Sequence, residues 1–256
     1  MAALHLAGAT EVYRVGGAQA VAALACGTKT IRPVAKVFGP GNSYVVEAKR
    51  QLFGRVAVDL LPGPSEILVL ADRTANPAWV AADLLAQAEH GRDSVALLLT
   101  DSEAILKAVA REIERQATTL PRGAILKNSL RESSLVLVRT MAEAVGLANA
   151  FASEHVSLQV KNPRALAPKL LTSGAIFLGG WSPVAVGDFL AGPSHELPTG
   201  GAGKSFAGLT ADQFQRRTSL VELDRRSLAK SVTAVEAFAR VEGLDAHGRS
   251  ARIRLA

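Results

Sequence analysis

The sequence predicts an α/β fold of two Rossmann-like units with mostly parallel sheets, followed by a helical C-terminal tail. Hydrophobic residues make up 48% of the 256 residues and aromatic residues only 5%, which favours helices packed on parallel sheets. Several predicted strands are continuous apolar runs, such as VALLLT at 95–100, as expected for strands buried on both faces. Strands and helices also alternate along the chain, which is typical of α/β domains. The length allows one large domain or two smaller ones.

The first part of the chain contains two strand–turn–helix units. Residues 11–15 and 34–39 are expected to be strands, and residues 16–27 and 40–54 the turns and helices that follow them. Cys26 lies in an apolar helical run and is expected to be a small core residue. As the single cysteine, it excludes an internal disulfide and a cysteine-based zinc site, and it fits a reducing compartment.

The same alternation continues to residue 180 and then stops. The expected strands are 56–61, 66–72, 95–100, 134–140, 155–160 and 174–180, and the expected helices are 76–90, 102–116, a helix ending near 151, and 162–171. Asn76 and Pro77 suit the N-cap and first position of the helix 76–90. Residues 180–208 are rich in glycine and proline, and such a long loop in a compact domain is expected to be functional. A further helix is expected over about 222–240.

Charge and hydropathy exclude several classes of function. The formal net charge is +6, but the basic residues are scattered and not interleaved with aromatics, so a nucleic-acid-binding surface is not expected. This charge gives a modest attraction for anionic small molecules. No stretch has the pattern of a signal peptide or the length of a membrane span. A cytoplasmic protein is therefore expected.

Four of the five histidines stand beside an acid or an amide. The groups are Gln87 with His90, Glu154 with His155, His195 with Glu196, and Glu242 with His247, and Asp188 adds a carboxylate within 180–208. Such a set predicts a metal site or an acid–base site. Simpler roles remain open for each group, such as helix capping at His90 or an Asx turn at Asp188. Two glycine turns before helices, VGGAQA and GPGNS, suit phosphate binding only weakly.

Taken together, these motifs resemble the histidinol dehydrogenase family over essentially the whole chain. The stretches that carry the resemblance are FGPGNSYVVEAKRQLFG, VDLLPGPSEILVLAD, ADLLAQAEHG, SEHVSLQV, SGAIFLGGWSPVAVGDFLAGPSHELPT and EGLDAHGRS. The resemblance implies two successive NAD-dependent oxidations, from L-histidinol through an aldehyde to L-histidine, at the end of histidine biosynthesis. It also implies zinc as a second cofactor and a homodimer whose C-terminal tail contributes to the partner's site.

The resemblance also implies roles for particular residues. The zinc ligands would be Gln87, His90, Asp188 and His247; the acid–base pair Glu154 and His155; and the cofactor contacts Gln19 and Asn42. Contacts to the substrate would come from Ser65, Gln87, His90, His155, Asp188, His195, Glu242 and His247. The implied domains are a partial cofactor-side domain at 1–60, a catalytic domain at 61–209 and a helical tail at 210–256.

Two departures from the family leave alternatives open. Family members carry a large N-terminal portion before the segment that this chain matches, so one or both units are expected to be incomplete. Ser194 stands where many members have asparagine before the histidine, which affects substrate contacts. The alternatives are a related zinc- and NAD-dependent alcohol dehydrogenase with another substrate, and a truncated, non-catalytic paralogue acting as a binding subunit.

Overall fold

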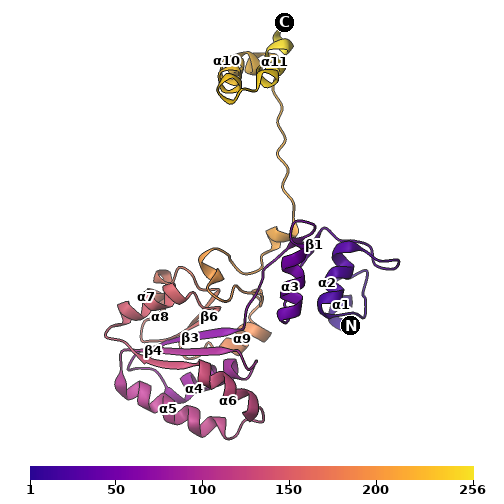
Figure 1. Cartoon of the computed structure of the whole chain (residues 1–256). Helices are drawn as coiled ribbons and strands as arrows, with labels where there is room; N and C mark the ends of the chain where they lie inside the picture. The colour runs from indigo at the N-terminus through magenta and orange to yellow at the C-terminus, as the bar shows by residue number, and fades with distance from the viewer. The chain divides into compact units, whose positions relative to one another are not determined.

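The computed structural model describes residues 1–256, which form two separate units, Met1–Phe214 and Gln215–Ala256. The first unit contains a parallel five-stranded sheet in the order β5-β4-β3-β6-β7 and a parallel pair, β1-β2 (Figure 1). The predicted α/β class with parallel sheets is confirmed, whereas the three predicted domain ranges stay predictions.

The five-stranded sheet is built from short apolar runs. Its strands are β3 (Glu66–Ala71), β4 (Val95–Thr100), β5 (Ser134–Leu137), β6 (His155–Gln159) and β7 (Ala175–Leu178), and every neighbouring pair is parallel. From β3 the chain builds outward through β4 to β5 and then returns to place β6 on the other side of β3. As a result β3, all of whose residues are buried, lies at the centre of the sheet.

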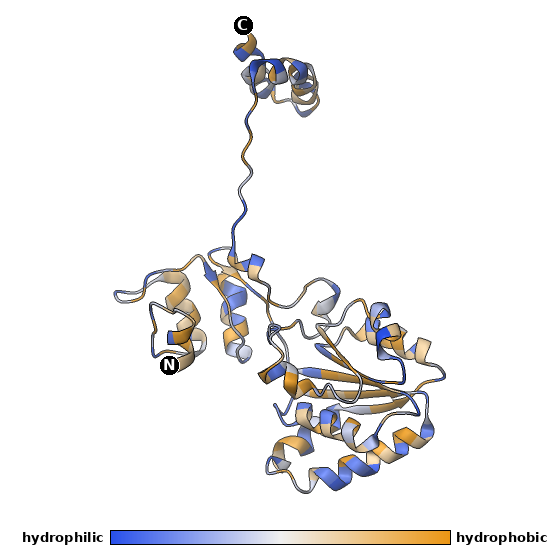
Figure 2. Ribbon diagram, turned by 180° about the vertical axis from the view of Figure 1, so that it is seen from behind, coloured by the Kyte–Doolittle hydropathy of each residue, from blue (hydrophilic) through white to orange (hydrophobic).

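Helices cover both faces of this sheet. The first group is α4 (Pro77–Ala88), α5 (Glu103–Ala117) and α6 (Gly123–Glu132), and the second is α7 (Met141–Phe151) and α8 (Pro163–Leu166), followed by the 3-10 turn η1 (Ala167–Lys169). Figure 1 shows the two groups on opposite sides of the strands. In Figure 2 the strands are mostly orange, while the helices are banded orange and blue, as expected for one buried face each.

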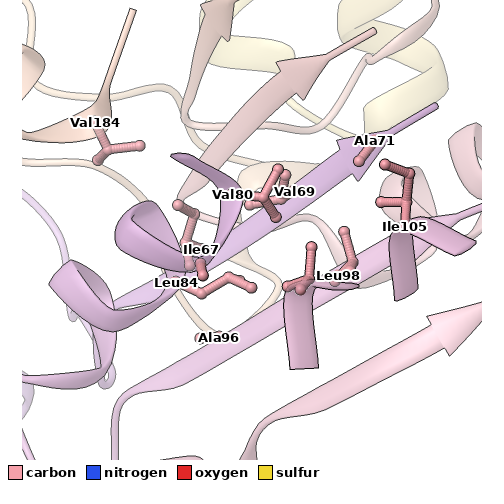
Figure 3. Close-up of a cluster of buried hydrophobic side chains, with 11 residues drawn as sticks. Ile67, Val69, Ala71, Val80, Leu84, Ala96, Leu98, Ile105 and Val184 are labelled. Atoms are coloured by element: carbon pink, nitrogen blue, oxygen red, sulfur yellow. The ribbon is translucent and has the colours of Figure 1, made fainter. Parts of the chain in front are cut away.

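Alternate residues of β3 supply the two cores. Ile67 and Val69 point to one face, where they pack against Leu84 of α4 and Leu98 of β4 (Figure 3). Leu68 and the other even-numbered apolar residues of β3 pack with α7 and β6 on the opposite face. This alternation follows from the two-residue period of a strand. The double burial explains why the strand sequences are continuously apolar.

The N-terminal part of the first unit forms a smaller layer. It comprises α1 (Ala2–Leu6), α2 (Gly17–Cys26), β1 (Lys36–Val37), α3 (Ser43–Leu52) and β2 (Ala57–Val58). The strand predicted at 11–15 is wrong, because this segment pairs with no other strand and its apolar side chains are exposed. The core position predicted for Cys26 is also wrong, because its side chain is exposed at the end of α2.

Three other segments differ from the sequence-based expectation. A helix not predicted, α6, packs its Leu126 against Leu85 and Ala88 of α4. The segment 180–208 is not a continuous loop, because it contains α9 (Val184–Phe189) and the 3-10 turn η2 (Ala202–Lys204). Residues 211–214 form a further 3-10 turn, η3 (Ala211–Phe214).

The second unit is a small helical hairpin. It consists of α10 (Arg225–Glu242), α11 (Asp245–Arg252) and the short turn η4 (Ile253–Leu255). Gly243 ends α10 in the left-handed conformation, with φ +67°, a common way to terminate a helix. Gly248 of α11 lies against Ala239 of α10, where an added Cβ would come within 3.2 Å. No helix in either unit is both long and apolar enough to cross a membrane.

Candidate functional site

The site begins where β3 and β6 lie side by side. Parallel pairing places Ile67 opposite His155, so the residues before them, Ser65–Glu66 and Glu154, meet at the amino ends of the two strands. The Ser65 hydroxyl donates to Glu154 Oε2 at 2.5 Å, and the Glu66 backbone N–H donates to the same oxygen at 3.0 Å. The Glu154 carboxylate is therefore held in one orientation by two donors from β3.

His155 is buried beside this carboxylate. Its Nδ1 lies 3.2 Å from the Glu66 carbonyl oxygen and 3.4 Å from Glu154 Oε2. Both neighbours are acceptors, so the hydrogen-bond pattern assigns the proton of a neutral imidazole to Nδ1. Nε2 is then the unprotonated nitrogen, and it faces Asp188 Oδ1 at 3.7 Å.

Asp188 joins His155 and His195 in one cluster. Asp188 comes from α9 and His195 from the segment after it, and His195 Nδ1 lies 3.1 Å from Asp188 Oδ1. One donor atom from each of the three residues lies within 4.8 Å of the other two. Asp188 Oδ1 is buried and no hydrogen-bond donor is aligned with it. Two imidazoles and a carboxylate are a donor set of the kind that suits zinc. Of the three residues, only Asp188 was predicted as a zinc ligand, and its buried Oδ1 without an aligned donor suits that role.

Two hollows meet at His195. The larger, of about 650 Å³, runs along β7 and is lined by His155, Asp188 and His195 among mostly apolar residues. The smaller, of about 160 Å³, is lined by Ser65, Glu154 and His195, and also by His90. Because His195 borders both, groups from the two hollows can act on one small molecule.

Gln87 and His90 are placed differently: His90 lines the smaller hollow, whereas Gln87 lines neither. Gln87 belongs to α4 and is 3% exposed, and its Nε2 has no hydrogen-bond partner. α4 ends at Ala88, so His90 lies beyond the helix and not on the helical face expected for it. The backbone turns at Glu89, and His90 Nδ1 lies 3.0 Å from the Ala86 carbonyl oxygen. Their joint zinc ligation stays a prediction.

The two residues predicted to contact the cofactor lie at the starts of helices. Asn42 caps α3, with its Oδ1 accepting from the Tyr44 and Val45 backbone N–H groups. Gln19 is exposed in the first turn of α2 and folds its side chain back towards Gly17. The turn before Asn42 lines the smaller hollow through Gly41. The predicted contacts to NAD stay predictions.

Glu242 and His247 belong to the second unit. Glu242 is the last residue of α10, and His247 lies in the first turn of α11, where its backbone N–H donates to the Leu244 carbonyl oxygen at 2.9 Å. Both side chains are exposed within that unit. Their roles towards zinc and substrate therefore stay predictions.

Two further acidic residues lie at the site: Glu66, which was not predicted from the sequence, and Glu196, which the sequence grouped with His195. Glu66 is buried, which raises the pKa of its carboxyl, although the Gly200 backbone N–H at 2.9 Å opposes this. Burial, and then the neighbouring Asp59 carboxyl, raise the pKa of Glu196 to about 7. One oxygen of each, Glu66 Oε2 and Glu196 Oε2, is buried without a hydrogen-bond partner. A charged residue opening an apolar strand was the available signal for Glu66, whereas the neighbouring His195 was the signal for Glu196.

Comparison with known proteins gives one consistent family. The family model described as histidinol dehydrogenase matches residues 1–255. The histidinol dehydrogenases of Rhodopseudomonas palustris and Geobacillus kaustophilus are 50% and 48% identical over all 256 residues. A crystal structure of histidinol dehydrogenase from Elizabethkingia anophelis matches 98% of this chain with a TM-score of 0.93 and 38% identity.

These matches cover only part of each relative. The chain spans 59% of the Rhodopseudomonas palustris protein, 60% of the Geobacillus kaustophilus protein and 58% of the Elizabethkingia anophelis chain. The family model nevertheless matches nearly all of this chain. The chain therefore belongs to the histidinol dehydrogenase family.

Proposed function

We propose that the chain takes part in the NAD-linked, zinc-dependent oxidation of L-histidinol through the aldehyde to L-histidine. Family membership supports the substrate and the reaction type. The observation that carries the proposal is the arrangement at the amino ends of β3 and β6. There a fixed carboxylate, Glu154, lies beside an imidazole whose Nε2 is free to accept a proton.

The first oxidation needs a base for the substrate hydroxyl. His155 Nε2 serves this role, because the Glu66 carbonyl oxygen holds the proton on Nδ1. NAD would accept a hydride from the carbinol carbon in each of the two oxidations. A zinc ion held by Asp188, His90 and Gln87, with His247, would orient the amino alcohol and polarise its oxygen. The hydroxyl proton and the hydride leave together, which gives the aldehyde.

The second oxidation needs water to be added to the aldehyde. Glu154 serves as the base for this water, because Ser65 and the Glu66 N–H hold its carboxylate towards the smaller hollow. The hydrate then loses one proton and, to NAD, a second hydride, which gives the carboxylic acid; loss of a further proton leaves the carboxylate of L-histidine. The two steps therefore use two bases that lie next to each other in the sequence.

The test is NADH formation by the purified chain with L-histidinol, NAD and zinc. We expect two NADH for each L-histidinol consumed, and loss of turnover when zinc is chelated. Asp188→Asn is expected to lower both bound zinc and turnover, the latter by at least about 100-fold. The matched control, Asp72→Asn at the opposite end of the sheet, should retain both.

Three results would contradict the proposal. One is a folded, zinc-supplied chain that forms no NADH from L-histidinol. Another is an Asp188→Asn variant with unchanged zinc content and turnover. The third is a preference for an amino alcohol without an imidazole, which would favour a related dehydrogenase with another substrate.

We further propose a homodimer in which the C-terminal unit serves the partner's site, as the family resemblance implies. The test mixes two inactive variants, Asp188→Asn and His247→Ala, after separate purification. If the tail acts on the partner, a mixed dimer contains one intact site and activity returns on mixing. If Glu242 and His247 act within their own chain, or the protein is a monomer, mixing restores nothing.

A further inference from the structure

A buried ion pair lies outside the groups used in the proposed reaction. Lys49 of α3 and Asp59, just after β2, have side chains only 2% and 1% exposed, and Lys49 Nζ lies 2.6 Å from Asp59 Oδ1. Lysine is almost never buried to this extent unless it is paired. Such a pair is weak evidence for stability, since apolar residues of similar volume often serve as well. Its location therefore calls for another explanation.

On one side, the pair holds the turn that precedes α3. Asp59 Oδ2 accepts from the Gly39 backbone N–H at 2.7 Å, and Lys49 Nζ donates to the Gly39 carbonyl oxygen. Gly39 has φ +128°, a conformation that other residues rarely adopt. At Gly41 an added Cβ would come within 2.4 Å of the Val45 side chain. The backbone of 39–41 is therefore fixed by both its geometry and the ion pair.

On the other side, the pair meets the segment that carries His195. The Glu196 carboxyl lies within hydrogen-bonding reach of Asp59. The Glu196 backbone is also anchored, because its N–H donates to Ser194 Oγ at 3.1 Å and its carbonyl oxygen accepts from Leu209 N–H at 2.9 Å. Asp59 thus touches two segments that lie far apart in the sequence.

Both segments border the same hollow. Gly41 and Glu196 line the cavity of about 160 Å³ that also contains Ser65 and Glu154. We propose that Lys49, Asp59 and Glu196 are positioning residues that hold the turn 39–41 and the His195 segment in fixed register across this hollow. The link to L-histidinol rests on the proposed function, whereas the coupling of the two segments does not.

The test measures amide hydrogen exchange in the full chain, segment by segment. Glu196→Ala is expected to accelerate exchange at 39–41, and Lys49→Met at 194–197, each by about tenfold, because each substitution loosens the distant segment. Glu196→Gln retains a side chain that can bond to Asp59 and should restore protection. Ser129→Ala, which removes a buried hydrogen bond to Ala88 at 2.7 Å, is the control for general loosening.

Removing one member of a buried ion pair is strongly destabilising, so a second variant is needed to separate loss of positioning from loss of folding. Lys49→Met/Asp59→Leu replaces both charges with apolar groups and should unfold cooperatively. It should still exchange about tenfold faster in both segments. With L-histidinol, its KM should rise more than its kcat falls, because the proposed bases remain intact.

The outcomes separate the two proposals. Unchanged exchange in the distant segment of Glu196→Ala or Lys49→Met, or in both segments of Lys49→Met/Asp59→Leu, overturns the positioning role whether or not the protein is active. Equal acceleration in Ser129→Ala overturns it as well. If the exchange pattern is as expected but L-histidinol is not oxidised, the coupling stands and the proposed function fails.

Discussion

The two ends of the five-stranded sheet use polar residues in opposite ways. At the amino ends of the strands, polar atoms are buried and several lack partners: Glu66 Oε2, Gln87 Nε2, Ser173 Oγ, Asp188 Oδ1 and Glu196 Oε2. At the carboxyl ends, polar residues are satisfied by local bonds. Asp72, for example, accepts from the backbone N–H groups of Thr74 and Lys161, each at 2.8 Å.

This difference identifies the candidate site better than topology does. In open α/β sheets, ligands usually bind outside the carboxyl ends of the strands, near the point where the strand order reverses. Here that point lies between β3 and β6, and a hollow lined by Asp72 and Lys161 is present there. Yet the side chains of Asp72, Thr74 and Ser102 in its lining already make local hydrogen bonds. Buried groups without partners are costly, and they gather at the other end, beside His155.

The largest expected effect is on turnover, and it compares the two ends directly. His155→Ala removes the base at the amino end, so kcat for NADH formation from L-histidinol should fall by about 10²–10⁴-fold. Asp72→Asn changes a carboxylate at the carboxyl end and should stay within about twofold of the unmodified chain. Steady-state kinetics with both variants measures this. Equal losses of turnover in the two variants would show that the amino ends of the strands are no more important for the reaction than the carboxyl ends.

The next largest effect is on the free energy of unfolding, and it concerns the core of the sheet between its two ends. Leu98 of β4 is fully buried in the core, so Leu98→Ala should lower the free energy of unfolding by about 2–5 kcal/mol. Leu137 of the edge strand β5 is 50% exposed, and Leu137→Ala should cost less than about 1 kcal/mol. Denaturant titration gives both values. A similar cost at the two positions would mean that β5 is covered in solution.

The central sheet could be predicted from the sequence because its signal is local. Strands such as 95–100 are continuous apolar runs, and a strand buried on both faces needs nothing else to mark it. The strand predicted at 11–15 was only a short apolar segment before a glycine turn, and without a pairing strand it does not form. Helix α6 was missed because only two of its residues are buried, Leu126 and Ser129, and one of these is polar.

The candidate site could be predicted only in part. The sequence marks Glu154 and His155 as an adjacent acid and base, but it does not show that Ser65 bonds to Glu154, since that contact depends on β3 pairing with β6. The pairing of Lys49 with Asp59 is equally invisible. Lys49 stands among polar residues and is therefore expected to be exposed, and nothing in the sequence links it to Asp59 in VAVDLL. Pairing between distant segments decides both cases.

A smaller effect, on stability and its pH dependence, is expected at Asp83 of α4. Burial raises the pKa of its carboxyl from 3.8 to about 6, although Ser157 and Gln159 oppose this. The folded protein therefore binds a proton more tightly than the unfolded chain does. The resulting stability is fully present below about pH 3.8 and is lost as the pH rises to about 6.

Replacing the Asp83 carboxyl with an uncharged amide removes the loss of stability that accompanies the rise in pH. Asp83→Asn should raise the free energy of unfolding at pH 7.5 by about 1–3 kcal/mol, and the gain should disappear towards pH 4. Urea titrations of both proteins at the two pH values measure it. Because Asp83 bonds to Ser157 and Gln159 and not to His155, turnover should change little. A gain of equal size at both pH values would show that burial of the charge is not the cause.

The smallest expected effect is a difference in stability between substitutions in two identical dipeptides, which lie near the carboxyl ends of β3 and β6. Asn76-Pro77 and Asn162-Pro163 each open a helix, but only Asn76 makes a capping bond, with Oδ1 accepting from the Ala78 N–H at 3.0 Å. Asn76→Ala should therefore cost about 1 kcal/mol of unfolding free energy, and Asn162→Ala less than about 0.5 kcal/mol. Thermal or urea unfolding of the two variants decides this. Equal costs in the two variants would mean that asparagine acts through the backbone conformation it adopts before proline. The capping bond of Asn76 at the carboxyl end of the sheet would then contribute little to stability.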